Sequence, residues 1–193
     1  MNVCVYGAAS RLIDESYKEA GRELGRKIAQ KGMGLVFGGG ANGMMGAVAE
    51  GANEKGGYIL GIVPKFFEEA GSEISYKKCT ENIYTETMRE RKRYLEEKSD
   101  AFIITPGGIG TFDEFFEILT LKQLGRHNKA IAIYNINGFF NEMAETLFKM
   151  VKENFITDDC VELCRTFMDA DKMIKYIEEY NPKKIDLNKV KIR

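Results

Sequence analysis

One predicted helix carries an arginine and a lysine on the face that turns toward the protein. The helix contains Met88-Arg-Glu-Arg-Lys92. At the helical angle of about 100° per residue, Arg91 and Lys92 lie beside the apolar seam formed by Met88 and Leu95. A guanidinium that faces inward needs an anion, and a phosphate group offers it planar, bidentate pairing. This helix is therefore a candidate binding element for a phosphorylated ligand.

A glycine-rich loop with an acidic residue follows the next predicted strand. It reads Pro106-Gly-Gly-Ile-Gly-Thr-Phe-Asp-Glu114, and its N–H groups and threonine hydroxyl could bind phosphate oxygens. The alternative is that Thr111-x-x-Glu114 is only a helix capping box. A cap does not require Pro-Gly-Gly-x-Gly before it, which favours a functional loop. Glu114 shares a helix face with Ile118 and Leu121, so it turns inward. A carboxylate there could stabilise positive charge at the anomeric carbon of a nucleotide or activate a water molecule.

A second glycine-rich loop, Gly38–Gly46, also lies between a predicted strand and a helix. Its glycines match Gly-x-Gly-x-x-Gly, and we expect Gly39, Gly40 and Gly43 to contact the nucleotide. The alternative is close packing of the strand against the helix without ligand contact. A dinucleotide site also needs an acidic residue about 20 positions further on. The next strand ends in Ile59–Pro64 without an acid, which argues against an NAD-linked oxidoreductase.

Short apolar runs alternate with longer amphipathic stretches, which predicts βαβ units and an α/β fold with a parallel sheet. In such sheets ligands bind beyond the carboxyl ends of the strands, where both loops are expected. The predicted domain spans residues 1–180, and the lysine-rich residues 181–193 form a basic C-terminal tail or an edge strand. The expected strands are Val3–Tyr6, Gly34–Phe37, Tyr58–Val63, Ala101–Thr105, Ala130–Tyr134 and, more weakly, Arg165–Met168; the expected helices are Ile13–Lys31, Gly43–Lys55, Thr85–Lys98, Phe112–Leu124, Phe139–Glu153 and Ala170–Tyr180.

Composition limits the classes of partner. The 28 basic and 29 acidic side chains give a formal net charge of −1, so no basic excess indicates binding to nucleic acid or an anionic membrane. Met1–Tyr6 lacks the features of a secretion signal, and no apolar run approaches the roughly 20 residues of a membrane span. The four cysteines form no Cys-x-x-Cys pair and the single histidine is His127, which predicts reduced thiols, no metal site and a cytoplasmic location.

The combination of Met88-x-x-Arg91-Lys92 with Pro106-Gly-Gly-x-Gly-Thr-x-x-Glu114 resembles the signature of the LONELY GUY family. These proteins are cytokinin riboside 5′-monophosphate phosphoribohydrolases, often labelled lysine decarboxylases. The resemblance runs from Val3 to about Ile156 and includes the Gly38–Gly46 loop. It implies a Rossmann-like three-layer αβα fold with a central, mostly parallel sheet of about six or seven strands. It also implies a homodimer and no metal or redox cofactor.

The resemblance assigns roles to individual residues. The family's catalytic arginine and glutamate fall on Arg91 and Glu114, and Glu73 lies where the family often has a glutamate near the nucleotide. The sequence departs from many members at Tyr6–Ser10, where they have Cys-Gly-Ser-Ser. The positions that match nucleotide contacts in the family are Lys92, Gly108, Ile109, Gly110, Thr111 and Thr120.

The function expected from sequence is therefore hydrolysis of the N-glycosidic bond of AMP or an N6-substituted AMP, giving free base and ribose 5-phosphate. The alternative is a non-catalytic nucleotide-binding or carrier protein on the same fold. No lysine lies in a setting that suggests a pyridoxal Schiff base, so the lysine decarboxylase label finds no support. A surplus of apolar helix residues, Met44, Met45, Phe115 and Phe116, adds to the expectation of a homodimer.

Overall fold

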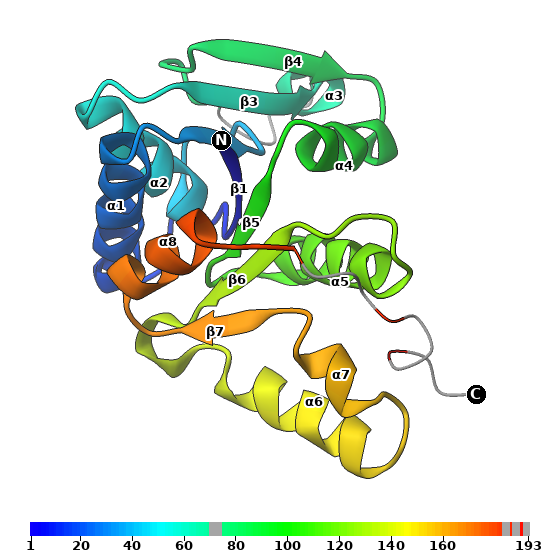
Figure 1. Ribbon diagram of the computed structural model, residues 1–193. Coiled ribbons are helices and arrows are strands. Elements are labelled where there is room, and N and C mark those ends of the chain that lie inside the picture. Colours follow the sequence, from blue (N-terminus) through cyan, green and yellow to red (C-terminus); the bar gives the residue numbers. More distant parts are fainter. Residues whose placement is uncertain (70–74, 183–185, 187–189, 191–193) are drawn as a thin grey trace.

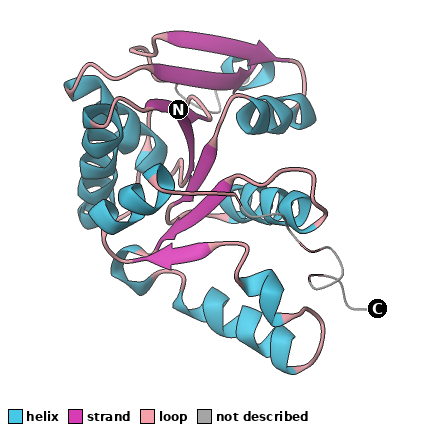
Figure 2. Cartoon of the chain, viewed as in Figure 1, coloured by secondary structure: helices cyan, strands magenta, loops and turns pink. Residues whose placement is uncertain are grey.

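The protein is a three-layer αβα domain built on one seven-stranded parallel sheet (Figures 1 and 2). The computed structural model describes residues 1–69, 75–182, 186 and 190. The strand order is β4-β3-β2-β1-β5-β6-β7, and every neighbouring pair is parallel. The strands are β1 (Asn2–Tyr6), β2 (Gly34–Phe37), β3 (Ile59–Pro64), β4 (Glu81–Thr85), β5 (Ala101–Ile104), β6 (Ala130–Tyr134) and β7 (Arg165–Phe167). The helices are α1 (Glu15–Gln30), α2 (Gly43–Glu54), α3 (Lys65–Glu69), α4 (Met88–Glu97), α5 (Ile109–Gln123), α6 (Asn141–Lys152), α7 (Asp158–Val161) and α8 (Ala170–Glu178), with a short 3₁₀ turn at Ile136–Gly138.

Alternate residues of the buried strands supply two separate cores. Val3 and Val5 of β1 pack into the layer that contains α1, α2 and α8, whereas Cys4 and Tyr6 pack into the layer that contains α4 and α5. This period of two is what a strand covered on both faces requires. The sequence prediction of an α/β, Rossmann-like fold is confirmed.

The order of the strands reverses direction at β1, which lies between β2 and β5. The connection after β1 leads toward β2, whereas the connection after its neighbour β5 leads toward β6, and ligands of open α/β sheets bind where connections diverge in this way. Both glycine-rich loops lie at this edge, one after β2 and one after β5. The fold therefore brings together the two loops that the sequence singled out.

Strand β4 was not predicted from the sequence, and the helix expected from Thr85 begins three residues later, at Met88. The side chains of Glu81, Asn82 and Tyr84 are exposed on this edge strand, so the segment lacks the continuous apolar run of an inner strand. The hydroxyl of Thr87 accepts a hydrogen bond from the Glu90 N–H at 3.1 Å and caps α4.

The C-terminal segment contacts the domain through Val190. This residue is buried, and its carbonyl accepts hydrogen bonds from the Gln123 amide at 2.8 Å and the Cys160 thiol at 3.1 Å. Most of residues 183–193 lie outside the described part of the chain, so the choice between tail and edge strand stays a prediction. Within the described residues, no helix is both long and apolar enough to cross a membrane.

Candidate active site

A buried ion pair between α4 and α5 forms the centre of the candidate site. The Arg91 guanidinium donates from Nη1 to Glu114 Oε1 at 2.8 Å, with only 7% and 10% of the two side chains exposed. Arg91 Nε also donates to the carbonyl of Ile62 on β3 at 3.3 Å. The sequence analysis expected a phosphate as the anion for the inward-facing guanidinium, but the structure shows that the Glu114 carboxylate of the same chain is its partner. A bound phosphate would be an additional partner.

The first glycine loop makes room for this arginine. A Cβ atom at Gly38 would lie 2.0 Å from Arg91 Nη2, so only glycine lets the guanidinium reach the end of β2. Gly39 and Gly43 have φ angles of +80° and +62°, which favour glycine. A Cβ atom at Gly39 would lie 2.3 Å from the Val63 side chain, and one at Gly43 would lie 2.3 Å from the Ala8 carbonyl oxygen. Tight packing therefore accounts for these glycines, and contact of Gly39, Gly40 or Gly43 with a nucleotide stays a prediction.

The alternative that Thr111 and Glu114 form a capping box is wrong. Helix α5 begins at Ile109, three residues before the predicted start, and its N-cap is Gly108. Thr111 is thus the third residue of the helix and Glu114 the sixth, too far along for either to have the role of a capping box. Glu114 instead projects inward to Arg91, and its burial is not explained by helix capping.

The first turn of α5 presents free N–H groups at the surface. Gly108, Ile109 and Gly110 are exposed, and a Cβ at either glycine would meet nothing within 4 Å. No acceptor among the described residues takes the N–H groups of these three residues. The N-terminus of a 15-residue helix carries partial positive charge, and its free donors suit an anion. An anion here would lie one and a half turns from Glu114.

Burial raises the pKa of Glu114 to about 7, and the attraction of Arg91 opposes this rise without cancelling it. The neighbours on the sheet side are neutral. Burial raises the pKa of the Cys4 thiol, and burial together with the Cys4 and Glu114 charges raises that of the Tyr6 phenol well above the ordinary value. Glu114 is therefore a carboxyl group that gains or loses its proton near neutral pH, as acid–base chemistry requires.

Tyr6 was not predicted as a site residue, although it ends β1 directly before Gly7. It is buried, its ring stacks on Phe102 at a centroid distance of 6.0 Å, and the charge of Glu114 is close enough to help raise the pKa of its phenol. The sequence signal was its polar hydroxyl at the end of an otherwise apolar strand at the ligand-binding edge. That signal resembles ordinary core packing, and only the structure shows that Glu114 is its neighbour.

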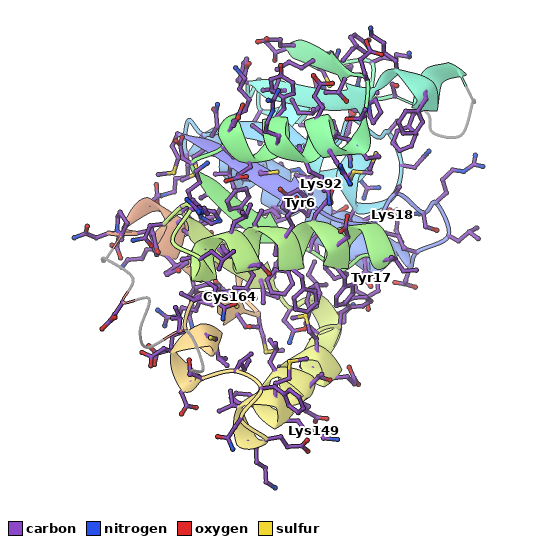
Figure 3. The ribbon with its side chains drawn as sticks, turned by 90° about the vertical axis from the view of Figure 1, so that its right-hand side faces the viewer. Tyr6, Tyr17, Lys18, Lys92, Lys149 and Cys164 are labelled. Atoms are coloured by element: carbon purple, nitrogen blue, oxygen red, sulfur yellow. The ribbon has the colours of Figure 1, made fainter. Side chains whose placement is uncertain are left out.

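Lys92 lies next to the pair but is engaged by other carboxylates. It bridges α4 to α5 by ion pairs to Glu117 at 2.6 Å and Asp113 at 3.2 Å, and Glu117 above all raises the pKa of the lysine. Figure 3 shows it between the two helices. Thr120 is exposed on α5, where it lines the same groove of about 600 Å³ as Lys92 rather than the Arg91–Glu114 pair. Glu73 lies outside the described residues. Within the described part of the chain, no group of three or more histidine, cysteine, aspartate or glutamate residues could hold a metal ion.

Comparison with known proteins shows to which family the chain belongs. The family model described as "Possible lysine decarboxylase" matches residues 45–177. The chain is 33% identical over 184 residues to cytokinin riboside 5′-monophosphate phosphoribohydrolase LOG2 of Arabidopsis thaliana, covering 95% of this chain and 85% of that protein. It is 33% identical over 180 residues to the LOG protein of Oryza sativa subsp. japonica, covering 93% and 74%. The chain belongs to the LONELY GUY family.

A solved structure of the same fold belongs to a protein that is named as a carrier. The molybdenum cofactor carrier protein from Chlamydomonas reinhardtii superposes with a TM-score of 0.68 and 22% identity, covering 92% of this chain and 96% of that one. At this identity the match shows the shared fold alone. It demonstrates that the same scaffold also occurs in a carrier protein.

Proposed function

We propose that this protein is a phosphoribohydrolase that hydrolyses the N-glycosidic bond of AMP or of an N6-substituted AMP. It is a hydrolase of N-glycosyl bonds, as its LONELY GUY relatives are named. The observation that carries the proposal is the buried Arg91–Glu114 pair, whose glutamate is the sixth residue of α5, close to the exposed N-terminus of that helix. The free N–H groups at the N-terminus of α5 suit a phosphate, and the Glu114 carboxylate suits chemistry at the sugar.

The 5′-phosphate would bind at the first turn of α5, on the free N–H groups of Gly108, Ile109 and Gly110. This position leaves the ribose to extend toward Glu114, the inward-facing acid one and a half turns further along. Arg91 holds the Glu114 carboxylate in place and favours its charged form. The exposed glycines admit the ligand because no side chain occupies the space above them.

In the reaction the ionised Glu114 would accept a proton from water while the water oxygen bonds to C1′. The C1′–N bond breaks, its electron pair leaves with the base, and the base takes up a proton. The products are free base and ribose 5-phosphate. As the bond breaks, the sugar gains oxocarbenium character, and the negative carboxylate stabilises this charge. Arg91 acts as a positioning residue for Glu114 in this scheme, and the phosphate binds chiefly to the loop.

The competing proposal is a non-catalytic nucleotide-binding or carrier protein. Its support is that a carrier protein has a similar fold. The raised pKa of a buried carboxyl group argues for catalysis, because a carrier gains nothing from burying an acid beside an anionic ligand. Incubation with AMP, GMP, CMP, UMP and N6-isopentenyl-AMP, followed by chromatography for free base, separates the two proposals. Release of base from a purine monophosphate supports the enzyme, whereas bound but intact nucleotide supports the carrier.

The proposed homodimer contact involves residues that differ, for the most part, from those that the sequence analysis named. Met44, Met45 and Phe115 are buried inside the monomer, so they are no surplus; only Phe116 is exposed, at 38%. Phe116 and Phe112 line both the groove beside Lys92 and an apolar groove of about 460 Å³ between α5 and α6. We place the dimer contact on this α5–α6 face. A Phe116→Asp variant should then sediment as a monomer under conditions in which the wild type is a dimer.

A further inference from the structure

A cavity of about 900 Å³ lies at the β7 edge of the sheet, on the opposite side of the protein from β4. It is formed by β7, α7, α8, the end of α5 and residues of the C-terminal segment. Its size is within the range of sites for small organic ligands. It shares no lining residue with the Arg91–Glu114 site or the groove beside Lys92. The lining residues are Lys122, Asn128, Asp159, Glu162, Leu163, Arg165, Thr166, Phe167, Lys172, Lys175, Tyr176, Glu179, Tyr180, Asn181, Asp186 and Val190.

Lys122 is a buried cation without a carboxylate partner among the described residues. Only 3% of the residue is exposed, and its ammonium donates to two neutral oxygens, the Lys129 carbonyl at 2.8 Å and the Tyr180 hydroxyl at 2.9 Å. An ammonium group has three N–H donors, so one is left. Burial without a counter-ion lowers the pKa of Lys122 to about 8. An anion in the cavity would supply what this lysine lacks.

Arg165 is a second cation of the same cavity that forms no ion pair with a described carboxylate. Its guanidinium carbon lies 5.4 Å from the ring centroid of Phe167 and 5.7 Å from that of Tyr176. Stacking on rings leaves the N–H edge of a guanidinium open to another partner. The ring of Tyr180, which is 5.0 Å from the Lys122 ammonium, extends the aromatic surface.

The charges around the cavity restrict the ligand further. Among the described lining residues, the four cations Lys122, Arg165, Lys172 and Lys175 stand beside four acids, Asp159, Glu162, Glu179 and Asp186. These described residues give no excess of positive charge that would favour a polyanion. One local position for an anion, beside the buried Lys122, is what remains.

We propose that this cavity is a second ligand site, for a small aromatic molecule with one anionic group. The anionic group, a carboxylate or a phosphate ester, would pair with Lys122 and accept from Arg165. The ring would lie against Phe167, Tyr176 and Tyr180, where aromatic contacts add to the apolar contribution. The site is separate from the nucleotide site, although α5 carries both Lys122 and Glu114.

Isothermal titration with benzoate and phenyl phosphate tests the proposal, with benzyl alcohol as the uncharged probe. Both anions should bind saturably, and benzyl alcohol at least about tenfold more weakly, because the charge-assisted hydrogen bonds are lost. Lys122→Met should weaken the anions by about tenfold or more. The matched control is Lys149→Met, an exposed lysine at the far end of α6 (Figure 3), which should bind as the wild type does. A preference for benzoate or for phenyl phosphate identifies the anionic group.

Three results would overturn the proposal. One is the absence of saturable binding by either anion. Another is unchanged affinity in Lys122→Met; if that variant does not fold, unchanged affinity in Arg165→Gln, on the exposed β7 edge, has the same meaning. The third is displacement of the probes by saturating AMP, which would place them at the nucleotide site. Binding that persists in Glu114→Gln and in the presence of AMP supports a separate site, whether or not the protein hydrolyses AMP.

Discussion

Replacing Glu114 by glutamine should change how the free energy of unfolding depends on pH. In the folded protein the carboxyl group has a pKa of about 7, against an ordinary value of 4.5. The folded state therefore holds this proton more tightly than the unfolded state does. The contribution of Glu114 to stability is fully present below about pH 4.5 and is lost as the pH rises to about 7. A difference of about 2.5 pKa units corresponds to about 3 kcal/mol.

Glutamine keeps the shape of the side chain and an oxygen for Arg91 but does not titrate. The free energy of unfolding of Glu114→Gln minus that of the wild type should therefore rise by up to about 3 kcal/mol between pH 4.5 and pH 8. Urea unfolding at five pH values in this range measures the difference, and other titrating groups cancel in it. Asp113→Asn, which removes an exposed carboxylate one residue earlier, is the control. A difference that stays constant would show that Glu114 does not titrate here, and one that falls with pH would show that Arg91 outweighs burial.

Three further predictions follow from the site. Gly38→Ala puts a Cβ atom 2.0 Å from Arg91 Nη2, so it should displace the guanidinium and lower the rate of hydrolysis by about tenfold or more. The control is Gly56→Ala, at a glycine with a φ of +66° and open space around it. This control should lower the stability of the protein but not the activity of the folded fraction. Adenosine should be hydrolysed roughly 10⁴-fold less efficiently than AMP, because it leaves the donors of the α5 N-terminus unpaired; equal kcat/KM values would contradict phosphate binding there. Hydrolysis should persist in EDTA without added cofactor, and loss that a divalent ion restores would reveal a metal requirement.

The sequence predicted those parts of the fold that burial dictates. Val3–Tyr6 and Ala101–Ile104 are covered on both faces, and their continuous apolar runs identify them as inner strands. The edge strand Glu81–Thr85 could not be found in this way, because three of its five residues are exposed and it lacks a continuous apolar run. Helix α5 was predicted to start at Phe112 but starts at Ile109. The low helix propensity of glycine gives no sign in the sequence that Gly110 belongs to the helix.

The two central residues of the candidate site could be predicted from the sequence, but the contacts around them could not. Arg91 and Glu114 each lie on the apolar face of a helix, and an inward-facing charge is a strong signal in a single sequence. That the two side chains contact each other depends on how α4 and α5 pack side by side, which helical periodicity does not contain. For the same reason the sequence did not reveal the ion pairs of Lys92 to Asp113 and Glu117, or the electrostatic effect of Glu114 on Tyr6.

We propose that Glu114 catalyses the hydrolysis of a nucleotide that is bound by its 5′-phosphate. The most direct test of this role is incubation of the wild type and Glu114→Gln with AMP and N6-isopentenyl-AMP, with free base and ribose 5-phosphate measured together. The wild type should release the two products in equal amounts. The variant should bind the nucleotide with nearly unchanged affinity and hydrolyse it at least about 100-fold more slowly. Intact nucleotide after long incubation with the wild type, or a Glu114→Gln variant that hydrolyses it at the wild-type rate, would contradict the claim.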